Sequence, residues 1–437
     1  MNLKIKNGLD KVRSLQIFQV IRYGGVILTN ILLAKSVLSL TEIGVFETLI
    51  FLSSMVSFFW VSGLLRGLLP TYPDLSEKEK KIFLFNVFLL FCLVSVIVSS
   101  LFFLLEKPIT VLLTEHDSLP YFRLLGLYLL INTPTYLVEY LYLLTDQPKK
   151  MIGFGVFAFG GYILAVMVPL WVGYTLEESF YCLIGLAVLK FLWLLVILIN
   201  RTIWSFNPGI LQGYLLLSFP LIMNMIVAGG AEYIDGVIVH RFFDKDTFAI
   251  FRYGAREFPL ALALSTAFSA ALIPEITKNL EKGMAEIKTR SRRLMHLLYP
   301  ISIVLMLSSP FLFPVVFNPE FADSAIIFNI YLLVLICRLL FPQTIIIGLK
   351  KTDIILWVSI FELAVNVILS LIFVQIWGLP GIALATLIAF AIDKIVLVVY
   401  NKVKFDIPVK KYLDFRLYGI YSIFLIASFL VALNFFD

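Results

Sequence analysis

The chain has 437 residues, of which 60% are hydrophobic and 15% are charged. Soluble domains are about 45–50% apolar and about 25% charged. This composition therefore excludes a water-soluble enzyme and indicates a protein whose solvent is the lipid bilayer. The three cysteines lie in separate apolar runs and the three histidines lie far apart in sequence, which argues against a disulfide scaffold and a zinc cluster.

Windows of about 20 apolar residues, the length that crosses about 30 Å of hydrocarbon, predict thirteen transmembrane helices. In chain order they are 15–39, 43–65, 82–105, 119–144, 151–172, 180–199, 211–239, 247–276, 294–317, 325–349, 354–377, 381–400 and 417–436. No hydrophilic stretch between them could form a separate folded domain, so the function must lie within the membrane. No phosphate-binding loop of the form GxxxxGKS or GxxxxGKT occurs, so the energy must come from a gradient or from another subunit.

The basic residues of the loops predict the orientation of the chain. Of the 35 Lys and Arg residues, 23 fall on the predicted N-terminal side of the membrane, whereas the opposite loops hold only Lys107, Arg241 and Lys245. Because Lys and Arg in short loops are retained in the cytoplasm, the N-terminus is predicted to be cytoplasmic. This topology accounts for the net charge of +6 without a nucleic-acid partner.

Matching features at offsets between 201 and 205 residues predict an internal repeat. The matching positions are Phe46 and Phe251, Pro70 and Pro274, and the pairs Lys149-Lys150 and Lys350-Lys351. We therefore expect an all-α polytopic protein of two six-helix bundles related by a pseudo-two-fold axis along the membrane normal. The predicted parts are an N-terminal lobe 1–200, a C-terminal lobe 201–404, and an amphipathic linker with a thirteenth helix at 405–437.

Charged side chains inside the spans are the functional candidates, because a charge at the bilayer centre costs about 2.5–3.5 kcal/mol even on insertion scales. The basic candidates are Arg22, Lys190, Arg252, Arg256 and Arg338. Guanidinium groups pair with phosphate oxygens in bidentate geometry, so these residues predict a cationic cavity. Arg252 and Arg256 are four residues apart and are expected on one helix face. Alternatively, Glu232 and Asp235 neutralise them in structural ion pairs.

A second group of polar residues lies in spans seven, eleven and twelve: Asp235, Asn366, Ser370 and Thr386. Asn366 and Ser370 share a helix face, and all four side chains offer the hard oxygens that an alkali cation accepts. The alternative is hydrogen bonding between helices by small polar residues. In span four, Asn132 and Glu139 are expected on one face, either for proton coupling or for the same interhelical bonding.

Several short patterns carry a resemblance to a known family. They are Leu38–Phe46 (LSLTEIGVF), Asp235 with the corner that follows it, Asn318–Ser324 (NPEFADS), Gly348–Lys351 (GLKK), Asn366, and Trp377–Thr386 (WGLPGIALAT). In this order the sequence resembles the multidrug/oligosaccharidyl-lipid/polysaccharide (MOP) exporter superfamily, and within it the bacterial O-antigen type polysaccharide flippases. The resemblance covers spans one to twelve. The thirteenth span departs from the twelve-helix plan that is usual for this branch.

The resemblance implies a flippase of the cytoplasmic (inner) membrane that carries a polyprenyl-diphosphate-linked oligosaccharide outward by alternating access. Such a protein is a transporter and not an enzyme. Its implied partners are the lipid-linked glycan, the bilayer, a polysaccharide polymerase and glycosyltransferases, with no nucleic acid. Similar flippases place arginines of spans one and eight on the cavity wall, where this chain has Arg22, Arg252 and Arg256.

The resemblance also implies a coupling ion, Na⁺ or H⁺, as the only cofactor. Related flippases of lipid-linked peptidoglycan precursors build a sodium site from spans seven, eleven and twelve, and Ser370 stands where that branch has a carboxylate. Besides a scaffold or channel subunit, two alternative functions remain open. A cation-coupled multidrug exporter of the same superfamily would favour a carboxylate-rich cavity, and a membrane glycosyltransferase or polymerase would need a sizeable outer loop or an acidic pair near the outer face.

Overall fold

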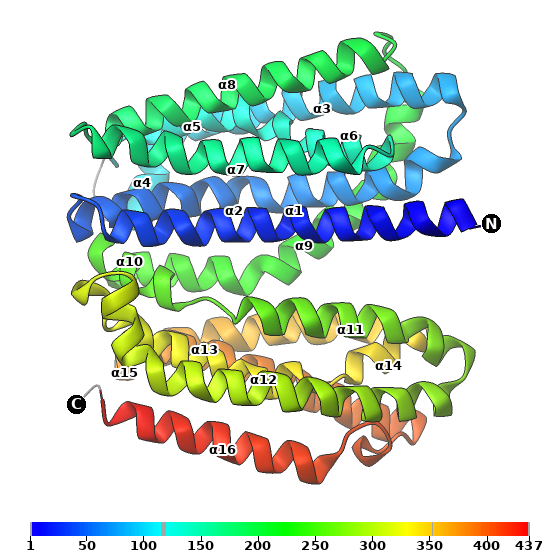
Figure 1. Ribbon diagram of the computed structural model, residues 1–437, viewed down its shortest axis with the longest axis vertical. Helices are drawn as coiled ribbons and strands as arrows, with labels where there is room; N and C mark the ends of the chain where they lie inside the picture. Colours follow the sequence, from blue (N-terminus) through cyan, green and yellow to red (C-terminus); the bar gives the residue numbers. More distant parts are fainter. Residues whose placement is uncertain (1, 115–118, 352, 436–437) are drawn as a thin grey trace. The chain divides into compact units, whose positions relative to one another are not determined.

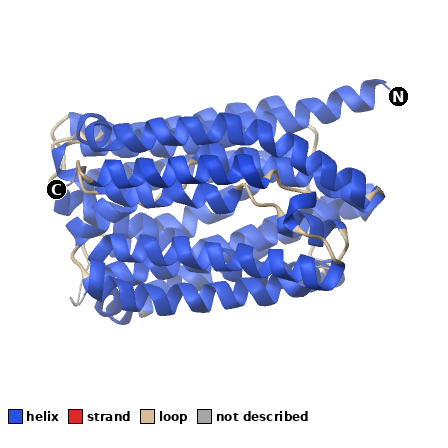
Figure 2. Ribbon diagram, turned by 90° about the horizontal axis from the view of Figure 1, so that it is seen from below, coloured by secondary structure: helices blue, strands red, loops and turns tan. Residues whose placement is uncertain are grey.

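The computed structural model describes residues 2–114, 119–351 and 353–435, with side chains except at 2–13, 112–114, 228, 231 and 232. Within these ranges every regular element is a helix and no strand occurs (Figure 2). This confirms the predicted all-α class. The chain divides into two compact units, Met1–Gly229 and Gly230–Asp437, each described here by itself.

Unit 1 is built from long helices and two short 3₁₀ helices (Figure 1). They are α1 (Asn2–Ala34), α2 (Leu40–Thr71), η1 (Tyr72–Asp74), α3 (Glu77–Leu104), α4 (Glu106–Thr114), α5 (Phe122–Asn132), η2 (Thr133–Tyr136), α6 (Leu137–Leu144), α7 (Pro148–Trp171), α8 (Leu176–Arg201) and the first part of α9 (Pro208–Phe242). Its core is aromatic and aliphatic, with Phe83, Phe91 and Leu194 fully buried. Burial of such side chains contributes about 1.5–3 kcal/mol each.

Unit 2 contains the rest of α9 and the remaining helices. They are α10 (Lys245–Gly254), α11 (Pro259–Lys278), α12 (Leu280–Val316), η3 (Pro319–Phe321), α13 (Ser324–Arg338), α14 (Pro342–Gly348), α15 (Asp353–Phe405), η4 (Val409–Lys411) and α16 (Phe415–Leu433). Tyr299, Met306 and Tyr412 are fully buried in its core. α16, the predicted thirteenth helix, packs against α12, where the hydroxyls of Tyr299 and Ser422 are 2.9 Å apart.

The unit boundary lies inside α9, whereas the repeat pattern predicts a lobe boundary at residue 200. The first part of α9 packs on α2, because the Tyr214 hydroxyl donates to the Leu64 carbonyl at 2.6 Å and a Cβ at Gly67 would lie 2.2 Å from Ser218 Oγ. The preceding loop is tied to α3, since Asn86 Nδ2 donates to the Ser205 carbonyl at 2.9 Å. These contacts join residues 201–229 to unit 1.

The predicted repeat matches Phe46 with Phe251, and the helices that contain these two residues, α2 and α10, both begin with a side-chain cap. Ser39 caps α2 in a capping box, where its hydroxyl accepts from the Glu42 N–H at 3.3 Å and its own N–H donates to Glu42 at 2.8 Å. Asp244, which stands 205 residues later, caps α10 by accepting from the Thr247 N–H at 2.8 Å. The two corners thus have the same local structure at the predicted offset, while the pseudo-two-fold axis stays a prediction.

Ten helices in the described ranges are long and apolar enough to cross a membrane, or eleven if α13 and α14, which meet at 43°, form one span. Two further predicted crossings, span four and one of the two spans within α15, also have counterparts in the structure. Span four is broken into α5, η2 and α6 around Pro134. α15 has 53 residues, about 80 Å at 1.5 Å per residue, and so holds two crossings. The protein is a multi-pass membrane protein.

Gly378 divides α15 into an N-terminal segment (353–377) and a C-terminal segment (379–405). Its φ of 62° and ψ of −137° belong to a region that only glycine adopts readily. At Gly381, a Cβ would lie 2.2 Å from the carbonyl oxygen of Phe373, so the two segments approach too closely for any side chain there. The turn at Gly378, Pro380 and Gly381, which lies between the predicted spans 354–377 and 381–400, therefore folds α15 back on itself.

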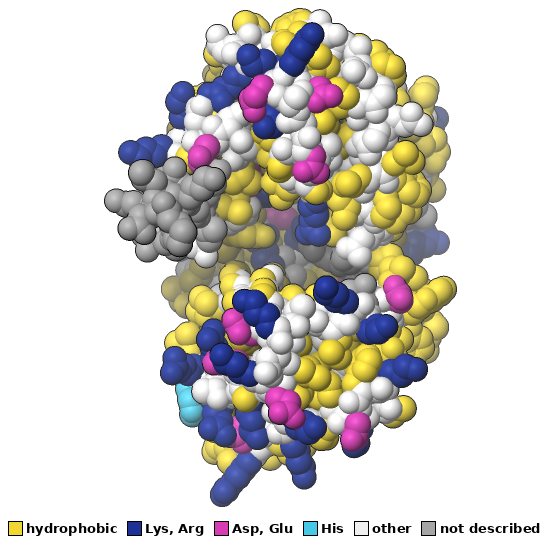
Figure 3. All heavy atoms as spheres, turned by 90° about the vertical axis from the view of Figure 1, so that its right-hand side faces the viewer, with side chains coloured by type: hydrophobic (Ala, Val, Ile, Leu, Met, Phe, Trp, Pro, Cys, Tyr) yellow, Lys and Arg dark blue, Asp and Glu magenta, His cyan; other side chains and the backbone are white. Residues whose placement is uncertain are grey.

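The loops predicted to be cytoplasmic gather at one end of each unit. In unit 1 the N-terminus, the α2–α3 turn, the α6–α7 turn and the α8–α9 loop lie at the right-hand end in Figure 1. In unit 2, taken by itself, the α11–α12, α14–α15 and α15–α16 connections lie together at one end of the unit. Lys and Arg side chains are frequent on the surface of each unit that Figure 3 shows. The predicted orientation of the chain rests on the basic residues of these loops.

Candidate functional site

The four oxygen-bearing residues of the second predicted group lie together inside unit 2. Thr386 Oγ1 donates to Asp235 Oδ2 at 2.5 Å, and Ser370 Oγ lies 3.4 Å from Asp235 Oδ1. Asn366 Nδ2 donates to Thr386 Oγ1 at 3.0 Å. All four side chains are buried, so the cluster is shielded from both lipid and water.

The fold of α15 is what assembles this cluster. Asn366 and Ser370 belong to its N-terminal segment, Thr386 belongs to its C-terminal segment, and the break at Gly378 turns one segment back along the other. Asp235 comes from α9. The signals that point to the cluster in the sequence are polar residues inside three apolar spans and the glycine-proline turn between two of them.

The donor set of this cluster fits an alkali cation. The side chains supply one carboxylate, one amide and two hydroxyl oxygens, which are hard ligands. The Oδ1 atom of Asn366 is buried and has no hydrogen-bond partner among the described residues. A buried oxygen in that state costs about 1–3 kcal/mol, and a cation at the cluster would satisfy it. In the described ranges no group of three or more His, Cys, Asp or Glu is placed to hold a metal ion.

Arg22 lies on α1 in unit 1 and is half-buried. One turn earlier Phe18 packs on α7, with its ring 5.7 Å from that of Phe159, and this contact fixes the rotation of α1. Among the described residues, no carboxylate lies within 4 Å of Arg22 and no side chain accepts its hydrogen bonds. Its guanidinium is therefore available to another anion.

The surroundings of Arg22 carry a positive balance. Glu139 of α6 is buried, accepts a hydrogen bond from Gln19 Nε2 at 3.4 Å and interacts with Arg22 electrostatically across a longer distance. Arg66 of α2 and Arg22 both act on the neighbouring Tyr140. Two cations and one carboxylate leave one positive charge, which favours the binding of an anion at this place.

The structure corrects the prediction that Arg252 and Arg256 share one helix face. α10 ends at Gly254, so only Arg252 is helical, and Arg256 lies in the irregular segment 255–258. Pro259 opens α11 and disfavours a helical conformation at Phe258, and a Cβ at Gly254 would lie 2.4 Å from the Ser324 carbonyl oxygen, so only glycine fits at the last residue of α10. Arg256 Nε donates to the Arg252 carbonyl at 3.4 Å. Of the two predicted acidic partners, the side chain of Glu232 lies outside the described residues, and Asp235 bonds to Thr386 and Ser370.

Arg338 is held by a carboxylate. Its Nη2 and Nε atoms donate to Glu257 Oε1 and Oε2 at 2.6 and 2.9 Å, a bidentate ion pair. Both residues stand at helix breaks, Glu257 between α10 and α11 and Arg338 at the end of α13. Broken helices inside a membrane expose backbone polar groups, so this is where charged side chains are best accommodated.

Lys190 of α8 also has a partner, because its ammonium donates to Asn132 Oδ1 at the end of α5. This contact again lies at a helix break, since the 3₁₀ helix η2 follows Asn132 directly. Asn132 and Glu139, expected on one face, therefore serve different neighbours, α8 and α1. In span four the interhelical bonding has a direct structural basis.

Comparison with known proteins places the chain in a family. Two family models described as "Polysaccharide biosynthesis protein" match it, one over residues 33–326 and one over residues 217–436. The chain belongs to the polysaccharide biosynthesis protein family. This confirms the resemblance to the polysaccharide branch of the MOP superfamily. A search of curated proteins found no match.

Solved structures show that this family member has the MOP transporter fold. The lipid II flippase MurJ, in an inward closed conformation, is 20% identical, with 96% of this chain and 98% of that chain covered and a TM-score of 0.71. The MATE transporter VcmN of Vibrio cholerae is 12% identical, with 92% and 99% covered and a TM-score of 0.61. A MOP superfamily transporter from Pyrococcus furiosus is 14% identical, with 92% and 96% covered and a TM-score of 0.58. These likenesses establish the fold of the chain.

The sequence-based candidates do not include the acidic residues Glu257 and Glu362. Both lie inside predicted spans, and an acidic residue at such a depth is itself a signal, because it needs a partner there. Glu362, on the N-terminal segment of α15, interacts electrostatically with Asp393, Lys394, Arg338 and Glu257.

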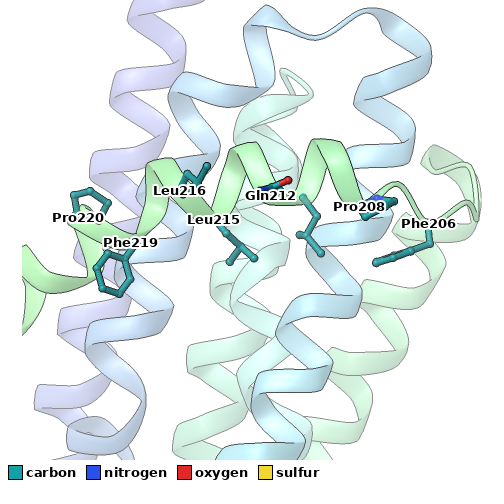
Figure 4. A pocket seen from close by; sticks show the side chains of 8 residues that line it. Phe206, Pro208, Gln212, Leu215, Leu216, Phe219 and Pro220 are labelled. Carbon is teal, nitrogen blue, oxygen red and sulfur yellow. The ribbon is translucent and has the colours of Figure 1, made fainter.

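An apolar groove follows the first part of α9 in unit 1. Its volume is about 440 Å³, and it is lined by Phe206, Pro208, Leu211, Gln212, Leu215, Leu216, Phe219 and Pro220. Leu215 and Phe219 project from the same side of the helix (Figure 4). A lining with one amide and otherwise apolar side chains suits hydrocarbon, so this groove is not a place for a phosphate group.

Proposed function

We propose that this protein is a flippase that moves a polyprenyl-diphosphate-linked oligosaccharide across a bacterial cytoplasmic membrane by alternating access. The observation that carries the proposal is Arg22, a half-buried guanidinium on a membrane-spanning helix with no carboxylate within 4 Å among the described residues. The polysaccharide family supports the glycan, and the fold shared with MurJ, a lipid II flippase, supports a lipid-linked substrate. The basic loops support a cytoplasmic N-terminus.

The physical reason is charge compensation inside the membrane. An arginine at this depth is costly without an anion, and a diphosphate offers oxygens in the geometry that a guanidinium binds bidentately. We assign Arg22 as the first contact of the diphosphate, with Arg252 and Arg256 as further candidates. Arg338 and Lys190 are weaker candidates, because Glu257 and Asn132 already occupy their donors.

The test is transport by the purified protein in liposomes. A polyprenyl-diphosphate oligosaccharide in one leaflet should become accessible to a glycan-cleaving enzyme on the other side, and the same glycan on a polyprenyl monophosphate should move more slowly. Export of a cationic dye without movement of the glycolipid would support the multidrug exporter instead. An increase in the mass of the glycan would support the glycosyltransferase or polymerase.

We also propose that the cluster of Asp235, Asn366, Ser370 and Thr386 binds Na⁺ as a coupling ion. When bound, the cation would add an electrostatic link between α9 and the two segments of α15. The residues hold it through the Asp235 carboxylate, the unsatisfied Asn366 Oδ1 and the two hydroxyls. With Ser370 as a neutral member, the cluster has one formal negative charge, so its affinity should be modest.

Sodium should therefore raise the melting temperature of the protein in detergent relative to potassium at equal ionic strength. Saturation at about 100 times the dissociation constant corresponds to about 2.7 kcal/mol of stabilisation. Asp235→Asn should abolish the difference, whereas Asp323→Asn, which changes an exposed carboxylate of the same unit, should keep it. Equal melting temperatures in the two salts would leave the cluster as interhelical hydrogen bonding only.

A further inference from the structure

Unit 2 contains a second polar cluster that is separate from Asp235 and its neighbours. Its members are Glu257, Arg338, Glu362, Asp393 and Lys394, which come from the α10–α11 break, the end of α13 and both segments of α15. None of these residues belongs to the proposed cation site. Five charged residues inside the predicted spans must therefore have a role other than binding that cation.

The two cations of the cluster share one aromatic ring and each has a carboxylate. The guanidinium carbon of Arg338 and the ammonium of Lys394 lie 5.0 and 5.7 Å from the ring centroid of Phe390. Arg338 binds Glu257 bidentately, and Lys394 Nζ lies 2.7 Å from Asp393 Oδ2. Exposed fractions of 24% for the Arg338 and Glu257 side chains and 12% and 7% for Lys394 and Asp393 show that both pairs are largely shielded.

Glu362 is the member without such a pair. It is half-buried, and among the described residues it makes no hydrogen bond and no ion pair within 4 Å. It lies nine residues into α15, about 14 Å along the helix and thus near mid-depth of a crossing. The charged groups that act on it are Asp393, Lys394, Arg338 and Glu257, and the thiol of Cys337 faces it as well.

The formal charges of the cluster show that it lacks one positive charge. Three carboxylates and two cations leave one negative charge, and an uncompensated charge near the centre of a bilayer is unfavourable by several kcal/mol. One proton makes the cluster neutral. Because Glu257 and Asp393 are each engaged by a cation, the proton belongs on the carboxyl that has none.

We propose that Glu362 is a proton-binding site of this transporter, with its occupancy set by the Asp393–Lys394 and Glu257–Arg338 pairs. The ligand is a proton, and the site is distinct from the Asp235 cluster. Protonation makes the cluster neutral, and deprotonation strengthens the pull of Glu362 on Lys394 and Arg338 in competition with their partners. The contacts between α13 and the two segments of α15 thereby become sensitive to pH.

A hydrophobic carbodiimide tests this site on the purified full chain, without any lipid-linked substrate. The reagent modifies protonated carboxyls in apolar surroundings, and mass spectrometry locates the adduct. Glu362 should be modified at low pH and protected as the pH rises between about pH 5 and about pH 9. Glu362→Gln should lose the adduct. Absence of modification at Glu362 over that whole range would overturn the proposal.

Two neighbouring variants give opposite and quantitative expectations. Asp393→Asn leaves Lys394 to stabilise the Glu362 carboxylate, so the pH of half-modification should fall by about 1 to 3 units. Lys394→Gln removes that cation, so the same pH should rise by a similar amount. The double variant should lie near the wild type, which also controls for misfolding. A half-modification pH that neither single variant moves would overturn the assignment.

The result is independent of the proposed flippase activity. Loss of glycolipid transport by an otherwise proton-binding protein would contradict the proposed function alone. An unmodified Glu362 in a protein that flips the glycolipid would contradict the proton site alone.

Discussion

Replacing Arg22 by alanine is expected to reduce the rate of glycolipid flipping by about 10- to 100-fold, because a charge-assisted bidentate contact is worth about 1.5–3 kcal/mol. Arg22→Lys should retain part of the rate, since it keeps the charge and loses the fork geometry. The measurement is transport of the polyprenyl-diphosphate oligosaccharide in liposomes. The protein should remain folded, because Arg22 has no ion pair within 4 Å among the described residues and Arg66 remains near Glu139 when Arg22 is removed.

The matched control for this prediction is Arg123→Ala. Arg123 lies in the same unit, is 79% exposed and pairs with Glu106 at 3.2 Å, so its replacement removes one positive charge with little structural effect. Normal transport by Arg22→Ala, or an equal loss in both variants, would remove Arg22 from the proposed substrate site. A slower rate for Arg22→Ala alone assigns the effect to that position.

Replacing Arg338 by leucine is expected to destabilise the protein by about 2 kcal/mol or more. The change leaves the Glu257 carboxylate partly buried without its bidentate partner, and breaking such pairs is strongly unfavourable. The double change Glu257→Leu and Arg338→Leu should recover most of the loss, because apolar pairs often replace buried ion pairs without cost. The melting temperature in detergent measures both effects.

Lys402→Leu serves as the comparison for Arg338→Leu. Lys402 pairs with Asp406 at 2.6 Å, but the two side chains are 56% and 87% exposed, so this pair should contribute less than about 1 kcal/mol. If Arg338→Leu keeps the wild-type melting temperature and yet stops transport, the residue contacts the substrate and the pair with Glu257 is incidental. Recovery of stability in the double variant would identify the pair as structural.

Much of the architecture could be predicted because membrane helices depend on local composition. Each predicted span has a helical counterpart, and Ser39, Asp244 and Gly378 mark corners that the structure confirms. The Asp235 cluster was also predictable in its membership, since polar residues in apolar spans have to find one another. The sequence did not indicate which of these residues would hydrogen-bond to one another, or that Asn366 Oδ1 would have no hydrogen-bond partner among the described residues.

The sequence does not predict which partners the basic residues inside the spans will have. Arg22, Arg252, Arg256, Arg338 and Lys190 are equivalent as isolated charges at depth, yet in the structure they have different surroundings. Arg338 meets a carboxylate 81 positions earlier in the chain, and Lys190 meets an amide 58 positions earlier. Contacts over such separations depend on how helices pack. The order of residues within one span contains no information about which residues of other spans it will contact.

By itself, the sequence determined that this protein is a multi-pass helical membrane protein, how its basic residues are distributed over the loops and which polar residues lie inside the spans, because these follow from hydropathy and from turn chemistry along the chain. The tertiary structure alone decided where helices break and which charges are compensated. At Gly254, the last residue of α10, the carbonyl of Ser324 comes so close that no side chain fits, and this contact arises only when the helices pack. The same packing leaves Arg22 without a carboxylate within 4 Å among the described residues and Glu362 without an ion pair there, and the proposed diphosphate and proton sites rest on those two residues.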